Sequence, residues 1–253
     1  MPPEPNVDRL AAEYDQESRW SFTVPAVATA LDGQVEELLT FVGTALDCCR
    51  PLIQFHSCEI VAVEYEKGVG LEERYDQERI ARHTARVTAD ERNGLTVTEI
   101  RDGIERLLRE VNATVVTNLL FDDAETHVVL SDFEGYVDSQ SADRYRRFHD
   151  DEWESAQPTD DPITAVVQHT RPATSNGVDT DFAHRFELRT ETGIWFGTDE
   201  IAATNRRRLA DVLRCLHAGL PDGNRHFGGE YWGEYSLAEA PNLGRLVPWM
   251  NDR

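Results

Sequence analysis

The sequence predicts an α+β protein in which antiparallel β-hairpins pack against helices on one face of the sheet. Two stretches, 114–133 and 182–196, are rich in β-branched and aromatic residues, and a short turn-like segment interrupts each of them, as in a hairpin. A helical pattern follows each stretch, at 141–153 and at 198–218. Strands followed by helices in this order are typical of the α+β class, and the recurrence suggests two ββα-containing halves.

A change of composition divides the chain into two parts. Residues 155–162 have the composition of a linker. We therefore expect an N-terminal α+β part over 1–156 and a C-terminal ββα part over 163–253, and the two could also form one continuous domain. The C-terminal part ends in a segment rich in glycine and aromatic residues, 226–249, which we expect to wrap over the core.

Apolar residues three and four apart indicate the helices of the first part. This spacing predicts helices over 7–17 and 33–49, and Pro51 ends the second. A further helix at 96–111 begins with Thr-Val-Thr-Glu, which has the spacing of a capping box. Residues 72–91 have helical propensity but little apolar pattern, so we expect a helix there that lies on the surface or frays.

The strands are indicated by short runs of β-branched residues. The run at 58–65 predicts a strand that is buried on both faces. The two hairpins are expected to turn at 122–125 and at 191–193, where Asp, Glu, Thr and Gly gather. Residues 163–169 fit neither a strand nor a helix clearly.

The helix at 198–218 has the clearest pattern in the second part of the chain. Thr198 is the expected N-cap, and Gly219 and Pro221 end the helix. Its apolar stripe contains one polar residue, Asn205. We interpret Asn205 as a residue that specifies the packing through a buried hydrogen bond.

The charge of the chain is strongly negative. Against 47 Asp and Glu there are only 25 cationic residues, 24 Arg and one Lys, and the net charge is −22. This composition resembles that of proteins from organisms that keep molar salt in the cytoplasm, where an acidic, hydrated surface maintains solubility and screening over about 3 Å removes its self-repulsion. Most acidic residues are therefore expected on the surface, and nonspecific nucleic-acid binding is not expected.

The location expected from the sequence is the cytoplasm. No apolar stretch approaches the roughly 18 residues of a spanning helix, so we expect no membrane partner. The first residues, Met-Pro-Pro-Glu-Pro, contain neither the basic cluster nor the apolar core of a secretory signal. Because the cytoplasm is reducing, disulfides are not expected.

A first candidate centre contains cysteine and histidine. Cys48, Cys49 and Cys58 lie within 11 residues, with His56 between them. Thiolates and imidazoles are good ligands for Zn²⁺ or Cu⁺, and a turn between helix and strand could bring Cys49, His56 and Cys58 together in a metal or thiol sensor. The spacing matches no common zinc motif, and cysteines packed as small hydrophobic residues explain it equally well.

A second candidate centre is acidic. Asp132 lies on the predicted returning strand, and Asp150 and Asp151 directly follow His149. A hydrolase could use these oxygens to hold Mg²⁺ or Mn²⁺ beside His149 acting as a base, because a bound divalent metal lowers the pKa of its water. On a surface rich in acidic residues the same groups could simply be solvated.

The sequence lacks the common catalytic and nucleotide-binding motifs. It contains no glycine-rich phosphate loop, no His-Glu-x-x-His, no Cys-x-x-Cys and no Gly-x-Ser-x-Gly. We therefore expect a salt-adapted accessory, regulatory or immunity-like binding protein that has a protein partner and neither catalytic activity nor a cofactor. The alternatives are a metal-dependent hydrolase centred on His149 and the Cys/His sensor, and a divalent metal is the cofactor that they would require.

Overall fold

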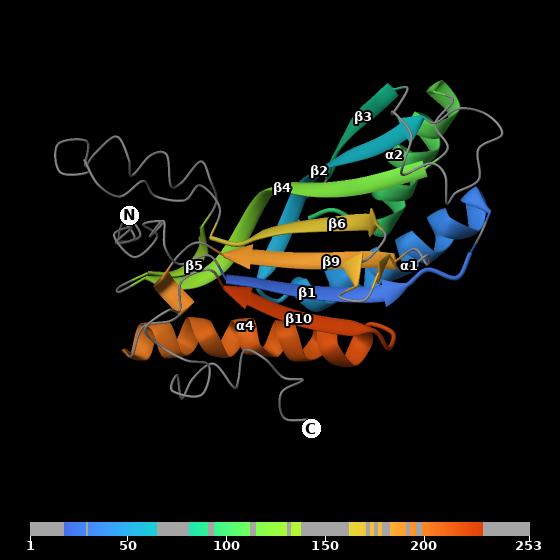
Figure 1. Cartoon of the computed structure of the whole chain (residues 1–253). Coiled ribbons are helices and arrows are strands. Elements are labelled where there is room, and N and C mark those ends of the chain that lie inside the picture. The colour runs from blue at the N-terminus through green and yellow to red at the C-terminus, as the bar shows by residue number, and fades with distance from the viewer. Residues whose placement is uncertain are drawn as a thin grey trace, which may run out of the picture.

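Three α-helices are interspersed among the strands in the described part of the computed structural model (Figure 1). The structure describes residues 18–28, 30–64, 81–90, 94–111, 115–130, 133–137, 162–170, 173–174, 177–178, 183–190, 193–195 and 199–229. The elements are β1 (Ser18–Pro25), α1 (Leu31–Cys49), β2 (Ile53–Glu64), β3 (Ala81–Thr88), α2 (Val97–Glu110), β4 (Val115–Leu130), β5 (Phe133–Val137), β6 (Thr164–Thr170), β7 (Ala173–Thr174), β8 (Gly177–Val178), β9 (Ala183–Thr190), the 3-10 helix η3 (Gly193–Trp195), α4 (Glu200–Gly219) and β10 (Asn224–Gly229). The fold is mixed α+β, and the sheet dominates it.

One antiparallel sheet contains eight of these strands. Their order is β10-β1-β9-β6-β4-β2-β3, and β5 pairs with β4. Strand β1 lies between two strands from the C-terminal part, and β4 pairs with β6, so both expected parts of the chain contribute to the same sheet. The short β7–β8 pair forms a separate ribbon.

The core lies between the sheet and the three α-helices. Alternate residues of the strands point toward the helices, as expected for an antiparallel sheet with one face on the core. Trp20 and Phe22 on β1 and Phe186 and Leu188 on β9 are fully buried in one continuous hydrophobic cluster. In Figure 1, α1 and α2 lie behind the strands and α4 runs below β10, and the opposite face of the sheet is toward the viewer.

Side chains cap the N-termini of α2 and α4. In α2, Thr96 Oγ1 accepts the backbone N–H of Glu99 at 3.3 Å, and the Glu99 carboxylate accepts the Thr96 N–H at 2.7 Å, which completes the capping box. In α4 the N-cap is Asp199, whose carboxylate accepts the N–H of Ala202 at 2.9 Å. The prediction of Thr198 as the cap was therefore wrong by one residue.

Asn205 confirms the interpretation of a buried hydrogen bond. It is fully buried, its Oδ1 accepts the backbone N–H of Val129 at 2.8 Å, and its Nδ2 donates to the carbonyl oxygen of Val129 at 2.9 Å. The same Nδ2 lies 3.4 Å from the carbonyl oxygen of Ile194. Asn205 thus attaches α4 to strand β4 and to η3.

The first predicted hairpin is wrong, because residues 122–125 do not form a turn. They lie within the continuous strand β4, and both sides of the segment pair with β2 in one register, from Ile53 opposite Thr126 to Cys58 opposite Phe121. Asp123 has a φ of 50°, and this left-handed residue changes which alternate residues face the core.

The second predicted hairpin and the helix at 72–91 are also wrong where the structure describes them. Strand β9 is confirmed, but residues 193–195 form η3, and β9 pairs with β1 and β6. Residues 81–88 form β3, an edge strand whose polar residues alternate with half-buried ones. An antiparallel strand pair followed by a helix occurs in β2–β3–α2, which is neither of the two predicted ββα units.

Other strands differ from the expectations mainly in extent. Strand β1 was not predicted, β2 begins at Ile53, five residues before the expected strand, and residues 163–169 belong mostly to β6. The helices expected at 7–17 and 141–153 lie outside the described residues, as does most of the C-terminal aromatic segment.

The prediction that disulfides are absent was wrong. Cys48 on α1 and Cys215 on α4 are joined by a disulfide, with their Cα atoms 5.4 Å apart. The two cysteines are separated by 167 residues in sequence, so only the packing of α1 against α4 brings them together. Within the described residues, no helix is both long and apolar enough to cross a membrane.

Candidate functional site

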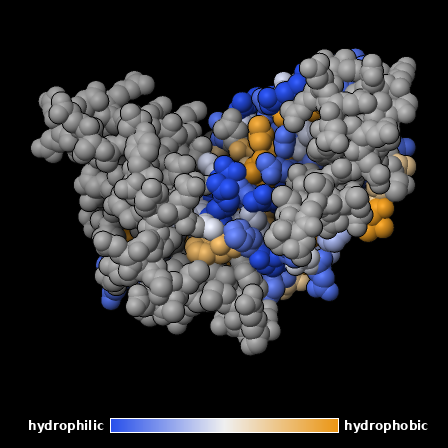
Figure 2. Space-filling model, viewed as in Figure 1, coloured by the Kyte–Doolittle hydropathy of each residue, from blue (hydrophilic) through white to orange (hydrophobic). Residues whose placement is uncertain are grey.

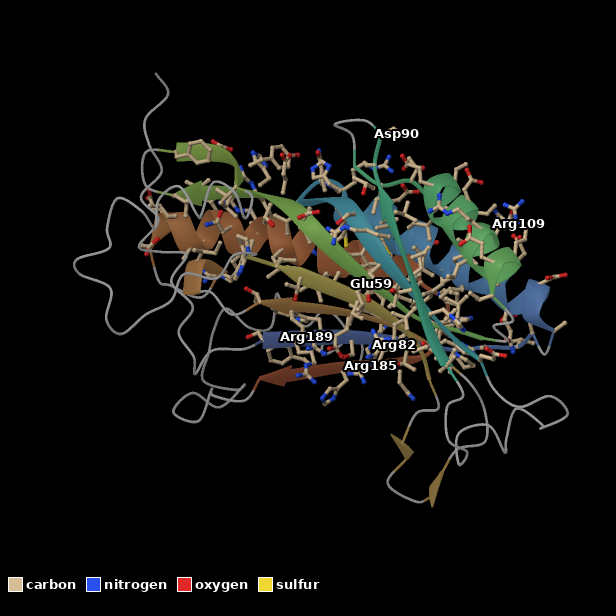
Figure 3. All side chains as sticks on the ribbon, turned by 90° about the horizontal axis from the view of Figure 1, so that it is seen from above. Glu59, Arg82, Asp90, Arg109, Arg185 and Arg189 are labelled. Carbon is tan, nitrogen blue, oxygen red and sulfur yellow. A yellow bond between two sulfur atoms is a disulfide. The ribbon has the colours of Figure 1, made fainter. Side chains whose placement is uncertain are left out.

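The face of the sheet opposite the helices carries several arginine side chains, although the chain as a whole is strongly acidic. Figure 2 views this face, and its described surface is mainly hydrophilic, with small apolar patches. We call it the open face. Figure 3 shows Arg185 and Arg189 on this side of the sheet, whereas Arg109 lies on α2 on the other side.

A buried carboxylate organises three arginines on the open face. Glu187 is 1% exposed, and its Oε1 accepts the Nε–H of Arg189 and lies 3.5 Å from Nε of Arg19. Its Oε2 accepts the hydroxyl of Ser21 at 3.0 Å and a guanidinium N–H of Arg185. Ser21 Oγ also accepts Arg185 Nη2 at 2.9 Å. We call these five residues the Glu187 cluster.

The strand register explains why these residues meet. Arg185, Glu187 and Arg189 alternate along β9 and therefore point to the same face. On β1, Ser21 lies directly opposite Glu187, and Arg19 lies directly opposite Arg189. Side chains directly opposite each other on antiparallel strands have Cβ atoms about 4.5–5.5 Å apart, so the pairing alone places all five groups within reach of one another.

The Glu187 cluster has more hydrogen-bond donors than its carboxylate uses. Three guanidiniums gather around one buried carboxylate, on a chain whose net charge is −22. Arg189 contacts Glu187 through Nε, and its two Nη groups have no hydrogen bond to any described residue. The Nε of Arg185 is buried and has no hydrogen-bond partner within the described part of the chain.

A second group of charges lies toward the other edge of the open face. Arg86 on β3 donates from Nη2 to the carboxylate of Asp123 at 2.7 Å and to the hydroxyl of Ser57 at 2.8 Å. Arg82 forms an ion pair with Glu59 at 3.6 Å. These pairs are more exposed than the Glu187 cluster, so each contributes less than about 1 kcal/mol to stability.

Uncharged residues separate the two groups. The open-face positions of β6 include Val166 and Gln168, and those of β4 include Asn118 and Leu120. Leu120 is 36% exposed. These positions of β6 and β4 thus form a neutral strip between two arginine-containing regions.

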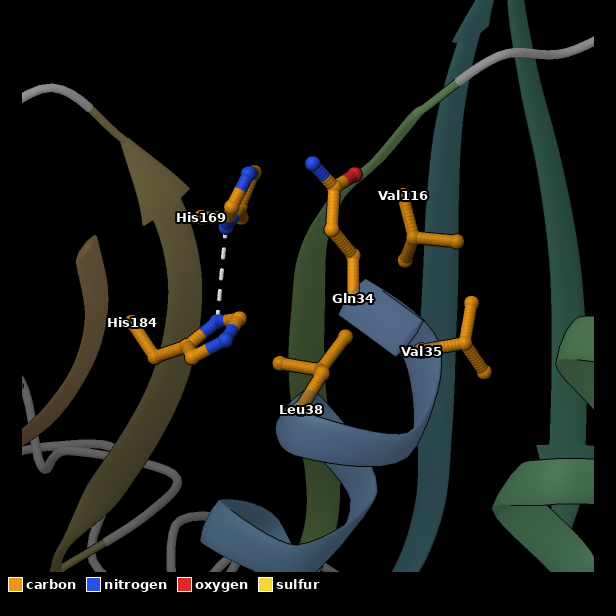
Figure 4. Close-up of a pocket in the computed structure, with 6 residues that line it drawn as sticks. All are labelled: Gln34, Val35, Leu38, Val116, His169 and His184. Carbon is orange, nitrogen blue, oxygen red and sulfur yellow. Dashed lines mark hydrogen bonds between the residues drawn. The ribbon is translucent and has the colours of Figure 1, made fainter. Parts of the chain in front are cut away.

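The helix side of the sheet contains a buried histidine pair. His169 on β6 and His184 on β9 are directly opposite each other, and their Nδ1 atoms are 3.3 Å apart (Figure 4). The two rings line a cavity of about 10 Å³ with Gln34, Val35, Leu38 and Val116, which leaves room for about one water molecule. Glu37 lies 3.8 Å from Nε2 of His184.

Burial controls the protonation of this pair. It lowers the pKa of His169 to about 4, and the neighbouring His184 acts in the same direction. Burial also lowers the pKa of His184, although the carboxylate of Glu37 opposes the shift. Both imidazoles are therefore neutral at pH 7, and one N–H can be shared between the facing Nδ1 atoms.

The residues of the predicted sensor do not gather around one point. Cys49 and Cys58 are free and buried, and burial raises the pKa of both thiols, that of Cys58 to about 12. His56 instead lies 3.4 Å from the carboxylate of Glu125. Within the described ranges, no group of three or more His, Cys, Asp or Glu side chains could hold a metal ion, so Cys49, His56 and Cys58 do not form a three-ligand site in this structure.

The residues of the predicted hydrolase lie outside the described residues. This holds for His149 and for the three carboxylates Asp132, Asp150 and Asp151. The hydrolase therefore stays a prediction from the sequence.

Comparisons with known proteins give no family for this chain. No family model, no curated protein and no solved structure matches it.

The sequence contains a signal for the part of the Glu187 cluster that lies on β9. The segment Arg-Phe-Glu-Leu-Arg at 185–189 alternates charged and apolar residues within a strand that was correctly predicted. Such alternation indicates a strand with one charged face. Arg19 and Ser21 could not be assigned to this face, because β1 was not recognised as a strand.

Proposed function

We propose that the protein is a salt-adapted accessory or regulatory binding protein without catalytic activity, and that the open face of its sheet binds an acidic protein partner. The main observation in support is the Glu187 cluster, in which three guanidiniums gather around one buried carboxylate on a chain of net charge −22. Clustered arginines on an acidic protein favour a partner of opposite charge and disfavour a second copy of the same chain.

The dimensions of the open face suit a protein segment. Strands β9 and β3 are four positions apart in the sheet, and neighbouring strands are separated by about 4.8 Å, so the two arginine-containing regions lie roughly 19 Å apart. An extended or helical segment can lie on the neutral strip and place acidic side chains toward either region. A broad surface of this kind is typical of macromolecular recognition, whereas small substrates bind in enclosed pockets.

Molar salt favours contacts of this type over long-range attraction. At about 1 M salt the Debye length is about 3 Å, so only charges in direct contact interact strongly. Guanidinium groups that are already oriented by a buried carboxylate lose little side-chain entropy when they bind a second carboxylate. The Glu187 cluster is oriented in this way.

The test uses a fluorescent poly-glutamate peptide and measures its anisotropy with the full chain in molar KCl, where repulsion by the overall charge is screened. We expect saturable binding that becomes about tenfold weaker in Arg185→Gln/Arg189→Gln and in Arg82→Gln/Arg86→Gln. The matched control is Arg101→Gln/Arg109→Gln on helix α2, which should bind as the unmodified protein does. Absence of binding, or equal weakening in the control, would overturn the proposal.

Metal analysis of the purified protein tests the alternatives. A stoichiometric divalent metal would favour the hydrolase centred on His149 or the sensor at Cys49, His56 and Cys58, and would argue against a binding protein without a cofactor.

A further inference from the structure

We infer that an extended segment of the acidic protein partner joins the sheet as a further antiparallel strand at the outer edge of β3. The inference rests on the proposed function and deepens it, because it names the part of the sheet with which the backbone of the partner pairs. The segment that fits this edge alternates acidic and apolar residues.

Strand β3 ends the eight-stranded sheet on the side opposite to β10 (Figure 1). It pairs with β2 on one side, and no described strand pairs with it on the other. Edge strands are usually protected against further pairing by a very short length, by proline or by lysine. Strand β3 has eight residues and contains neither proline nor lysine. Its outer edge is therefore able to accept another strand.

The register of β3 against β2 shows which peptide groups face outward. The N–H of Ala89 donates to the carbonyl oxygen of His56 at 2.8 Å, and the preceding residues of β3 continue in the same register. In an antiparallel pair the peptide groups of alternate residues point toward the partner strand, and those of the residues between them point away. The N–H and C=O groups of Arg82, Thr84 and Thr88 therefore point away from β2, and no other described residue makes a backbone hydrogen bond to them.

The two faces of β3 differ in character, and this difference selects the segment. On the open face, β3 presents the exposed side chains of Arg82, Thr84 and Arg86, and none of its eight residues is acidic. On the helix side, Val87 is buried and Ala85 packs against the core. Side chains directly opposite each other on antiparallel strands have Cβ atoms about 4.5–5.5 Å apart. An added strand that alternates acidic and apolar residues therefore places carboxylates beside the arginines and apolar side chains beside Val87.

The existing ion pair of Arg82 leaves room for a second carboxylate. Arg82 lies 3.6 Å from Glu59, and its side chain is 56% exposed. A guanidinium has five N–H donors, so it can bind the carboxylate of an added strand while it remains paired with Glu59.

The arginines of β3 disfavour a second copy of this chain as the occupant of the edge. Two β3 strands paired about Thr84 would place Arg82 of one copy directly opposite Arg86 of the other. Pairing about Arg86 would place the two Arg86 side chains opposite each other. Like charges in this position destabilise a strand pair, whereas opposite charges stabilise it. The edge thus discriminates between a strand like itself and an acidic strand.

The test uses fluorescent peptides that alternate Glu and Val, have the eight-residue length of β3 and are titrated with the full chain in molar KCl. One peptide is unmodified, a second is N-methylated at every Glu and a third at every Val. In an antiparallel pair that sets Glu opposite Arg82, the N–H groups of Glu bond to β3 and those of Val point away. We expect N-methylation of Glu to weaken binding at least about tenfold, as measured by anisotropy, and N-methylation of Val to leave it unchanged.

A variant of the protein checks the position of the peptide. Thr84→Pro removes one outward N–H, and proline is tolerated on an edge strand where the N–H faces outward. We expect the unmodified peptide to bind about tenfold more weakly to this variant. The matched control is Thr84→Val, which keeps the N–H and should bind as the unmodified protein does. Circular dichroism shows whether each variant is folded, and if Thr84→Pro is not, the methylated peptides decide the question on the unmodified protein.

The outcomes separate this inference from the proposed function. Equal binding of the two methylated peptides, or equal weakening in Thr84→Pro and Thr84→Val, would overturn strand addition, even if poly-glutamate binds elsewhere on the open face. Binding of the alternating peptide with the expected effect of N-methylation, but no binding of poly-glutamate, would support strand addition and overturn the wider acid-binding surface. Dimerisation of the protein that is lost in Thr84→Pro would show that a second copy occupies the edge and would overturn the inference.

Discussion

Removal of the disulfide between Cys48 and Cys215 should produce a large and specific loss of stability. The cross-link joins residues separated by 167 positions and so restricts the unfolded chain strongly. The chain-entropy relation for a loop of this length gives about 5 kcal/mol at 25 °C. Because residual structure in the unfolded state reduces the effect, we expect reduction to lower the free energy of unfolding by about 3–5 kcal/mol.

The assay is denaturant unfolding of the oxidised and the reduced protein, together with the variant Cys48→Ala/Cys215→Ala. Reduction should lower the midpoint of the unmodified protein and leave that of the double variant unchanged, since the variant has no disulfide to lose. Thiol titration of the unfolded, unreduced protein should find two free thiols, those of Cys49 and Cys58, and four after reduction.

Two results would refute the reasoning. Four free thiols before reduction would show that the cross-link does not form in the protein as purified. A midpoint that is insensitive to reduction, with only two free thiols found, would show that the cross-link does not restrict the unfolded chain as the chain-entropy relation requires. A disulfide persists only where the compartment is not strongly reducing, so the cytoplasmic location predicted from the sequence depends on the same experiment.

Three further predictions concern buried polar groups. As the pH decreases from about 6.5 to about 4, His169 should lower the free energy of unfolding by about 3 kcal/mol, because its imidazole binds a proton in the unfolded chain but not when it is buried in the folded protein. The variant His169→Gln should reduce this pH dependence in denaturant titrations. Glu187→Gln should lower the stability by about 3 kcal/mol in thermal and denaturant unfolding, because it leaves three arginines without their shared carboxylate, whereas the exposed Glu59→Gln should change it by less than about 1 kcal/mol. Asn205→Ala should lower the free energy of unfolding by about 2 kcal/mol, since it removes the side chain that pairs with the N–H and C=O of Val129. The surface change Thr204→Ala should lower it by about 0.5 kcal/mol, and an equally small effect of Asn205→Ala would contradict the role assigned to Asn205.

The helices that were predicted correctly have signals within their own residues. The capping box at Thr96 and Glu99 and the apolar stripes of α1 and α4 depend on neighbours at most a few residues away. The hydrogen bond of Asn205 could be predicted for the same reason, because a polar residue on an apolar stripe needs a partner. Its partner Val129 could not be named, since β4 meets α4 only in the folded chain.

The errors concern strands whose partners are distant in sequence. Residues 122–125 have the composition of a turn, yet both sides of the segment pair with β2, and Asp123 adopts a left-handed φ within the strand. In β3 the exposed Arg and Thr residues hide the apolar pattern, because the strand lies at the edge of the sheet. Local propensity does not decide these segments, since their hydrogen bonds are made with other parts of the chain.

The sequence alone determined the strongly negative charge, the near absence of lysine, the mixed α+β class and the positions of the amphipathic helices. These properties are sums over composition or depend on residues within one or two helical turns. Tertiary structure decided the insertion of β1 beside β9, the disulfide between α1 and α4 and the Glu187 cluster. Each of these joins residues more than 150 positions apart, and the register of the sheet or the packing of helices, which no local pattern encodes, brings them into contact.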